Sequence, residues 1–475
     1  MAVVPRSVLG WAARRKAQVV ELVGRRATEL AAMVRSGEAR AVEVVSAHLD
    51  HLEAVDERLG AFVSSRRQEA LEEAEALDAR GDRDELPLAG VPISVKDVID
   101  LGGEPTRHGS LATSAEPAAK DAEVVANLRA AGAVVIGKTR VPELALWGTS
   151  DDPDGAAVSP WDPTRTAGGS SGGAAAAVGA GVVPLSLAAD GFGSVRIPAA
   201  ACGVVGIKPG GDLVPEMLNG AHHFFGMSRF GPIATSVADA ALALDVMAGT
   251  DSLRSLAPLD RELKIAVSWR APAPGVVVTS TWREAAIEAG RLLRHLGHDV
   301  THADPPYDRA MVQAGVARWT QTGGVDIEAM GLDVDDLQPR TRAHVAAGAR
   351  LARVSPVREE EAIRWQDRAG NFFTEHDILV TPVFARTQPA AMPWHGRPWA
   401  ANVAANLSAY PFAPPWNISD QPAIAVPLWH DDGRPLSIQV VAGHGCEDLV
   451  LGVAAQLESL VPWRRHAPGW GVPGA

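Results

Sequence analysis

Short apolar runs alternate with helical patterns along most of this chain, and that alternation constrains its fold more than any other feature. GVPISVKDV, AVVIGK and VVPLSLAAD are apolar runs of strand length, whereas VVANLRAAG and AAAAVGAG have helical spacing. Strands that alternate with helices are typical of α/β proteins. We therefore predict an α/β fold with a central sheet covered by helices on both faces.

The two ends of the chain extend this pattern. Residues 1–60 place apolar side chains at helical spacing and predict two amphipathic helices. A mainly helical, more polar segment is expected at about 304–365, and closing strands with a final helix at about 376–465. Because no repeat or sharp change of composition divides the chain, we expect a single domain over residues 1–475.

A proline- and tryptophan-rich stretch over residues 388–416 interrupts the second half of the chain. Its prolines exclude a long helix or a central strand. We predict an ordered loop there, lying over the surface or over a pocket.

The charge balance argues against whole classes of partner. The 475 residues include 44 basic and 57 acidic side chains, a net charge of −13, which would repel nucleic acid and an anionic membrane. We expect a small neutral molecule as partner instead. Cys202 and Cys446 are the only cysteines, so no disulfide framework is implied. The first residues lack the continuous apolar segment of a secretory signal, and we expect a cytoplasmic protein.

Residues 166–189 carry no charge, and their number would suffice to span a bilayer. Their glycines, small side chains and single proline would give a membrane helix a poor lipid-facing surface. A glycine-rich loop, a buried alanine-rich helix and a buried strand are the expected structures.

The segment GGSSGG, residues 168–173, is open to several interpretations by itself. It lacks the Lys-Ser/Thr pair that ends a Walker phosphate loop. It fits the nucleophile elbow G-x-S-x-G with Ser170 or Ser171 at the centre, but an elbow needs a preceding strand and PWDPTRTA contains two prolines. A flexible Gly/Ser linker is the third alternative.

An ordered set of motifs places this segment in context. The motifs are GVPISVKDV, GAVVIGKTRVPE, GGSSGGAAAAVGAG, DGFGSVRIPAAACGVVGIKP, GPIATSVADAALALDVMAG, WNISDQPAIAVP and LSIQVVAG. In this order they resemble the amidase signature family over nearly the whole length. The resemblance implies that family's fold, with a large mixed central sheet and a Ser–Ser–Lys core at about 85–250. It also implies hydrolysis of C–N bonds without a cofactor or a metal.

Carried over by position, the resemblance makes Ser194 the nucleophile, Ser170 a bridging serine beside a non-proline cis peptide, and Lys96 the base. The residue types suit these roles. A serine hydroxyl is a weak nucleophile and needs a neighbouring base. A lysine can be that base only when neutral, a state that burial among apolar neighbours favours. Taken singly, Lys96 could instead be a solvated lysine at a strand end and Ser194 a helix cap.

The same resemblance assigns the oxyanion hole to the backbone N–H groups of Gly191, Phe192, Gly193 and Ser194. Phe192 stands where the family more commonly has glycine, and Gly191 where it more commonly has threonine. Every residue except proline supplies an N–H, so Phe192 is compatible with the chemistry. Its ring could line the pocket or pack in the core. Arg196 could simply pair with a carboxylate such as Asp190.

Three segments are expected to form the pocket: residues 151–159, 213–230 and 394–416. His222 and His223, the only adjacent histidines, are expected to line or flank it. We predict no metal site, because further ligands at matched spacing are missing.

The predicted function is hydrolysis of neutral amides, anilides or carbamates (urethanes) through an acyl-enzyme. Within the family, the chain is most similar to the branch that includes nylon-oligomer amide hydrolases, and bacterial urethanases are a second resemblance. One alternative is a partner-dependent subunit resembling the A subunit of the tRNA-dependent amidotransferase. Another is an α/β-hydrolase esterase with Ser170 or Ser171 as nucleophile. A third is a binding protein without activity.

Overall fold

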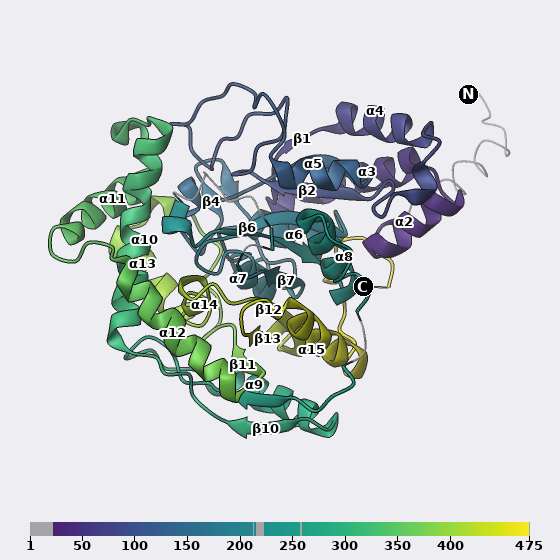
Figure 1. Cartoon of the computed structure of the whole chain (residues 1–475). Helices are drawn as coiled ribbons and strands as arrows, with labels where there is room; N and C mark the ends of the chain where they lie inside the picture. The colour runs from purple at the N-terminus through teal and green to yellow at the C-terminus, as the bar shows by residue number, and fades with distance from the viewer. Residues whose placement is uncertain (1–21, 212, 215–222, 257–258, 475) are drawn as a thin grey trace, which may run out of the picture.

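One mixed sheet runs through the molecule from top to bottom in Figure 1. The computed structural model describes residues 22–211, 213–214, 223–256 and 259–474. In these residues eleven strands join the sheet, in the order β1-β3-β2-β6-β8-β7-β12-β13-β11-β9-β10. They are β1 (Phe62–Ser65), β2 (Pro92–Lys96), β3 (Val134–Thr139), β6 (Leu185–Asp190), β7 (Val205–Lys208), β8 (Arg229–Ala234), β9 (Lys264–Val267), β10 (Asp299–His302), β11 (Ile378–Pro382), β12 (Ala423–Asp431) and β13 (Arg434–Ala442). The short strands β4 (Asp151–Asp152) and β5 (Gly155–Ala156) pair separately.

Strand direction changes along the sheet. β2 is parallel to both β3 and β6, and β9 is parallel to both β10 and β11. The strands between these two parallel groups pair antiparallel, from β6 through β8, β7, β12 and β13 to β11. The mixed sheet that the resemblance implied is therefore confirmed.

The central strands are buried along their whole length. Every residue of β2, β3, β6, β7, β8 and β11 is buried. Because successive side chains of a strand point to opposite faces, this burial means that both faces of the sheet are covered. The predicted α/β architecture is confirmed.

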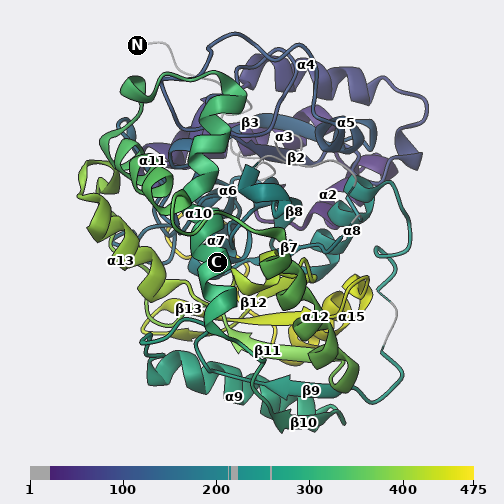
Figure 2. The ribbon, with the colours of Figure 1, turned by 60° about the vertical axis from the view of Figure 1, so that its left-hand side comes forward.

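Helices supply that cover and add a further layer. They are α2 (Ala27–Ser36), α3 (Ala41–Leu59), α4 (Arg67–Asp78), α5 (Glu123–Ala130), α6 (Gly172–Gly179), α7 (Arg196–Cys202), α8 (Val237–Ala248), α9 (Ser280–His295), α10 (Arg309–Met330), α11 (Pro339–Ala352), α12 (Glu359–Glu375), α13 (Trp399–Ala409), α14 (Pro415–Ile418) and α15 (Glu447–Leu460). Figure 1 shows α10 to α13 gathered on one side of the molecule, and Figure 2 brings α10 to the front. α10 packs against α11, α12 and α14.

The proline- and tryptophan-rich stretch differs from the predicted loop. It contains the eleven-residue helix α13 and the first two residues of α14. Pro398 lies directly before α13 and Pro411 follows it, and no proline falls between them. The prolines therefore mark the ends of this helix, and the prediction that they exclude one was too strict.

Other predictions of local structure hold. Helices α2 and α3 confirm the two amphipathic helices for the described part of residues 1–60, since residues 1–21 lie outside that part. The charge-free stretch forms the short helix α6 and the buried strand β6, as expected. No helix within the described ranges has the length and apolar character to cross a membrane. The single domain stays a prediction, as do the cytoplasmic location and the absence of a nucleic-acid partner.

Candidate active site

Lys96 is the last residue of β2 and its side chain is buried. Its Nζ donates to Ser170 Oγ at 2.8 Å and to the Ala189 carbonyl oxygen at 3.0 Å. Burial lowers the pKa of Lys96 to about 7, although the charge of Asp190 acts in the opposite direction. A substantial fraction of Lys96 is therefore neutral near pH 7, as a general base requires.

The peptide bond between Gly169 and Ser170 is cis, as the family resemblance implied. Ser150 holds this turn on its other side, since its Oγ donates to the Ser170 carbonyl at 3.1 Å and accepts from the Gly172 N–H at 2.9 Å. The hydroxyl of Ser170 is left to face Lys96.

Ser194 lies in the turn between β6 and α7, at the edge of a pocket. Its carbonyl oxygen accepts a hydrogen bond from the Ser171 N–H at 3.3 Å, so the two serine-containing turns are joined directly. The structure thus brings Lys96, Ser170 and Ser194 to one place from three separate parts of the sequence.

Asp190 fixes the shape of the Ser194 turn. Its carboxylate accepts hydrogen bonds from the N–H groups of Gly193 at 2.6 Å and Val195 at 3.1 Å. It also pairs with the Arg196 guanidinium, Nε to Oδ2 at 2.9 Å, and both side chains are fully buried. Burial alone would raise the pKa of Asp190, but the charge and hydrogen bonds of Arg196 hold it well below the ordinary value.

Arg196 connects this turn to the C-terminal part of the chain. Its guanidinium donates to the Ala413 carbonyl at 3.0 Å, to Gln439 Oε1 at 2.7 Å and to Asn417 Oδ1 at 2.6 Å. Asn417 in turn donates to Asp190 Oδ1 at 2.8 Å. The pairing with Asp190 that the sequence left open is therefore observed, within a larger buried network.

The four N–H groups proposed for the oxyanion hole are not equivalent. The Gly193 N–H is taken by Asp190. In the part of the chain that the structure describes, no hydrogen bond from the N–H of Gly191, Phe192 or Ser194 is found. These three donors remain for a substrate oxygen, whereas Gly193 is already satisfied.

The glycine at 191 is explained by close packing. A Cβ at this position would lie 2.6 Å from Ser228 Oγ and 2.7 Å from the Phe224 ring, both too close for any side chain. Gly191 therefore lets Phe224 approach the turn. This accounts for its departure from the threonine that is commoner in the family.

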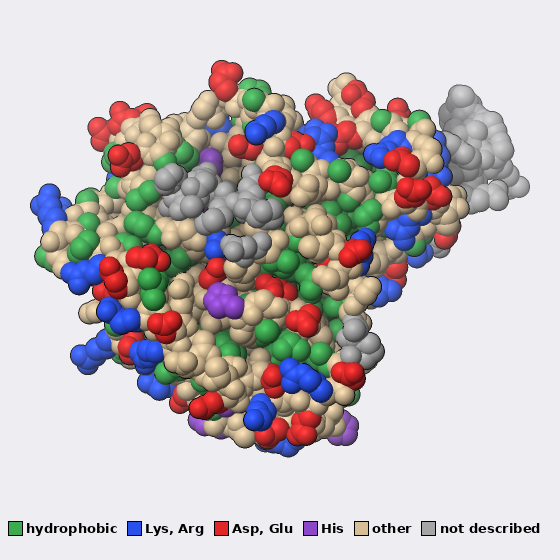
Figure 3. Space-filling model, in the orientation of Figure 1, with side chains coloured by type: hydrophobic (Ala, Val, Ile, Leu, Met, Phe, Trp, Pro, Cys, Tyr) green, Lys and Arg blue, Asp and Glu red, His purple; other side chains and the backbone are tan. Residues whose placement is uncertain are grey.

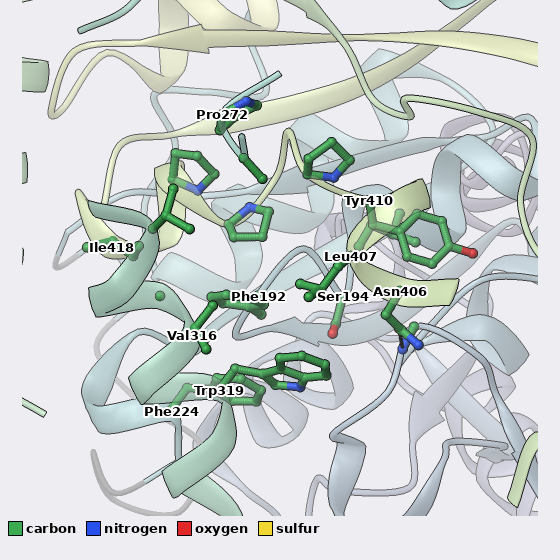
Figure 4. A pocket seen from close by; sticks show the side chains of 18 of the residues that line it. Phe192, Ser194, Phe224, Pro272, Val316, Trp319, Asn406, Leu407, Tyr410 and Ile418 are labelled. Carbon is green, nitrogen blue, oxygen red and sulfur yellow. Dashed lines mark hydrogen bonds between the residues drawn. The ribbon is translucent and has the colours of Figure 1, made fainter. Parts of the chain in front are cut away.

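Phe192 lines the pocket beside Ser194, with its ring half-buried. The ring stacks against Phe224, at 5.8 Å between centroids, and against Trp319, at 6.4 Å. All three rings belong to the pocket wall, as Figure 4 shows. Of the two alternatives left open by the sequence, the structure shows the first, in which the ring faces the pocket.

The pocket is apolar and free of charge. It contains about 780 Å³ of space between atoms, including the part that opens to solvent. Its lining residues are Ala145, Leu146, Trp147, Gly148, Gly169, Phe192, Ser194, Ile197, Phe224, Pro272, Ala273, Met311, Val312, Gly315, Val316, Trp319, Asn406, Leu407, Tyr410, Pro411, Pro414, Pro415 and Ile418. None of these described residues is charged, whereas Figure 3 shows acidic and basic side chains scattered over the molecular surface.

The predicted pocket segments are confirmed in part. Residues 394–416 contribute Asn406, Leu407, Tyr410 and three prolines, and residues 213–230 contribute Phe224. Residues 151–159 do not line the pocket, so that prediction was wrong. Asp151 and Asp152 are instead held by ion pairs with Arg340 and Arg140.

Helix α10 forms one wall of the pocket, and this wall was not predicted from the sequence. Met311, Val312, Gly315, Val316 and Trp319 face the pocket at helical spacing. This apolar face was a detectable signal, but we interpreted the segment only as helical and polar. Ala145 to Gly148, a turn after β3, form a further wall that no pattern indicated.

His223 does not line the pocket but packs behind it. Its Nδ1 lies 2.8 Å from Asp326 Oδ2, and its ring meets the Phe224 ring edge to face. His222 lies outside the described residues. Within the described residues, no group of three or more His, Cys, Asp and Glu side chains could hold a metal ion.

Comparison with known proteins gives one consistent family. The Amidase family model matches residues 43–451. The chain is 39% identical to AmiB2 of Mycobacterium tuberculosis, whose name assigns it to the amidases, over 92% of this chain and 96% of that protein. It is 32% identical to the acylamidase of Rhodococcus erythropolis, over 93% of this chain and 96% of that protein. The solved structure of 6-aminohexanoate cyclic dimer hydrolase superposes with a TM-score of 0.83 at 30% identity, covering 94% of this chain and 99% of that one.

Proposed function

The chain belongs to the amidase family and is a hydrolase that acts on amides, and we propose that Ser194, Ser170 and Lys96 carry out its reaction. The observation that carries this proposal is the buried hydrogen bond between Lys96 and Ser170, beside the pocket that Ser194 lines. A lysine with a pKa near 7 and a serine within its reach form a base that a second serine can use.

The reaction proceeds in two halves. Neutral Lys96 takes a proton from the Ser170 hydroxyl, Ser170 takes one from Ser194, and Ser194 Oγ bonds to the amide carbonyl carbon. The C–N bond then breaks, and the proton returns along the same path to the leaving amine. Water attacks the resulting ester carbonyl with the same base and releases the acid together with free Ser194.

The developing negative charge falls on the carbonyl oxygen. We propose that the N–H groups of Gly191, Phe192 and Ser194 stabilise it, because no residue of the described chain accepts their hydrogen bonds. Gly193 was also predicted to belong to the oxyanion hole, but its N–H donates to Asp190. We propose that this hydrogen bond positions the turn that contains Ser194.

The substrate is a neutral amide, anilide or carbamate with apolar or aromatic groups. A charged substituent would lose its hydration in a pocket that offers no opposite charge, which is costly. Phe192, Phe224 and Trp319 present aromatic surface to the substrate. The acylamidase and cyclic-dimer hydrolase relatives are consistent with neutral amides.

Two of the alternative functions, an amidotransferase A subunit and an esterase, agree less well with the structure of the site. An amidotransferase A subunit would take its amide from a zwitterion such as glutamine, whose charges have no counterpart in this pocket. An esterase built on a nucleophile elbow needs a strand directly before Ser170 or Ser171, and the described segment before Gly168 contains only turns and isolated bridges.

The test is to label and assay three serine variants. Purified protein is treated with an aryl phosphonate and assayed on p-nitroanilides, aryl carbamates and carboxylate-bearing analogues of each. We expect Ser194→Ala to lose labelling and turnover, and Ser170→Ala to keep slow activity. Ser171→Ala is the matched control, because its hydroxyl donates only to the Ala189 carbonyl. Labelling at Ser170 or Ser171, or preference for the charged analogues, would contradict the proposal.

A further inference from the structure

Gly315 lies in the interior of α10, where a glycine is not required by the backbone. The helix runs from Arg309 to Met330, and Gly315 keeps ordinary helical geometry. Glycine destabilises the interior of a helix relative to alanine. Its presence at this position therefore calls for a reason in the surrounding space.

That space is the substrate pocket. An added Cβ at Gly315 would lie 3.2 Å from Ile418 Cδ1 and 3.4 Å from Phe192 Cζ. The contact with Ile418 would require a shift of a few tenths of an ångström, and the contact with Phe192 would be at van der Waals distance. A methyl group at 315 would therefore take up space in the pocket wall between Phe192 and Ile418.

The pocket continues past this point. Phe192 stands next to Ser194, and Ile418 lies on the other side of Phe192 in Figure 4. Met311, Val312 and Pro415 line the same continuous space. Gly315 therefore borders the passage from the neighbourhood of Ser194 to this apolar end.

We propose that Gly315 determines the size of the apolar substrate group that the pocket accepts, an inference that rests on the proposed function of this site. A methyl group at 315 narrows the passage and rejects long or bulky groups, while short groups near Ser194 bind as before. The substrate class is then narrowed to neutral amides with an extended apolar or aromatic group that reaches Ile418.

The same helix offers a matched control. Gly324 is also in the interior of α10, but an added Cβ there meets no atom within 4 Å. Gly315→Ala and Gly324→Ala make the same chemical change in the same helix, and only the first adds an atom to the pocket. Both remove a helix-interior glycine, so the general effect of that change on the helix would appear in both.

The experiment measures binding of an anilide series, from acetanilide to octananilide, by tryptophan fluorescence. Trp147 and Trp319 line the pocket and report on its occupancy. We expect Gly315→Ala to weaken binding of the longest anilide by about tenfold and to leave acetanilide unchanged. Gly324→Ala should match the parent protein throughout. Ile418→Val removes Cδ1, the nearest atom, and should restore long-chain binding when combined with Gly315→Ala.

All binding measurements use the Ser194→Ala background, so that binding is read without hydrolysis, and hydrolysis is assayed separately in the parent protein with Ser194 intact. Equal loss for all chain lengths, or no loss for octananilide, would overturn the role of Gly315. A parent protein that binds the anilides but never hydrolyses them would instead contradict the proposed function. Thermal midpoints of both glycine variants test the fold, and a large drop in Gly315→Ala alone would show that the position is structural.

Discussion

The Asp190 carboxylate accepts the Gly193 N–H at 2.6 Å while it pairs with the Arg196 guanidinium. One buried carboxylate therefore both neutralises a buried cation and holds the backbone directly before Ser194. It also keeps the Gly193 N–H turned away from the substrate.

Asp190→Asn should destabilise the protein severely. It leaves the fully buried Arg196 without a counter-charge, a change that costs about 3 to 5 kcal/mol of unfolding free energy. Urea denaturation measures the loss. Asp82→Asn is the control, because Asp82 pairs with Arg80 at an exposed position and should cost less. Equal losses in the two variants would show that burial of the Asp190–Arg196 pair is unimportant.

The activity should rise with pH through the pKa of Lys96. Since burial places that pKa at about 7, the neutral base becomes more abundant from about pH 6 to pH 8 and then saturates. We expect kcat/KM for a neutral anilide to rise over the same pH range. In Lys96→Ala this rise should disappear, and the rate should fall by a factor of about 10² to 10⁴. A variant that retains this rise would assign the base to another group.

Lys96→Met should change how stability depends on pH. The unfolded lysine binds a proton below its ordinary pKa of 10.5, but the folded one does so only below about 7. The unfolded state therefore binds more protons between these values, and the parent protein gains stability as pH rises through this window. Denaturation at several pH values measures the free energy of unfolding. We expect the value for Lys96→Met to exceed that of the parent protein by the largest amount at pH 7 and below, and the difference to shrink toward pH 10.5.

Lys208 provides a comparison for this titration. It is buried as well, and burial lowers its pKa to about 8, so Lys208→Met should show the same trend over a narrower window. A flat difference between Lys96→Met and the parent protein across this range would mean that Lys96 is charged in the folded state.

Phe192→Leu should alter selectivity more than stability. The Phe192 ring is half-buried and lines the pocket, so its loss should change the ratio of kcat/KM for aromatic and aliphatic amides by about tenfold, or about 1.4 kcal/mol. Phe62→Leu makes the same change at a buried position on β1 and should lower stability without changing the ratio. If Phe192→Leu behaved like Phe62→Leu, the ring would be a core residue.

The proposed catalytic residues could be named from the sequence because the ordered set of motifs resembles one family. Taken singly, Lys96 at the end of an apolar strand, Ser170 in GGSSGG and Ser194 before an apolar run each had another interpretation. Their contact, and the network of Asp190 with Asn417 and Gln439, depends on pairing between distant strands, which no local pattern records.

Other elements escaped prediction for physical reasons. β7 and β8 are short and contain glycine or proline, residues that weaken a strand signal. The pocket face of α10 is interrupted by Gly315, which lowers its apparent apolarity. Residues 151–159 were expected at the pocket, but the carboxylates of Asp151 and Asp152 form ion pairs with Arg340 and Arg140 that no local pattern records.

The hydrogen-bond partners of Arg196 also bear on when, during translation, the turn around Ser194 can take its final shape. The turn that contains Ser194 leaves the ribosome more than two hundred residues before Ala413, Asn417 and Gln439, which accept hydrogen bonds from Arg196. β12 and β13, which carry the last of these, enter the middle of the sheet between β7 and β11. A nascent chain that ends before Gln439 therefore has its serine but not the support that shapes the turn around it. We therefore expect hydrolytic activity to appear only after the C-terminal hairpin has been translated and has folded.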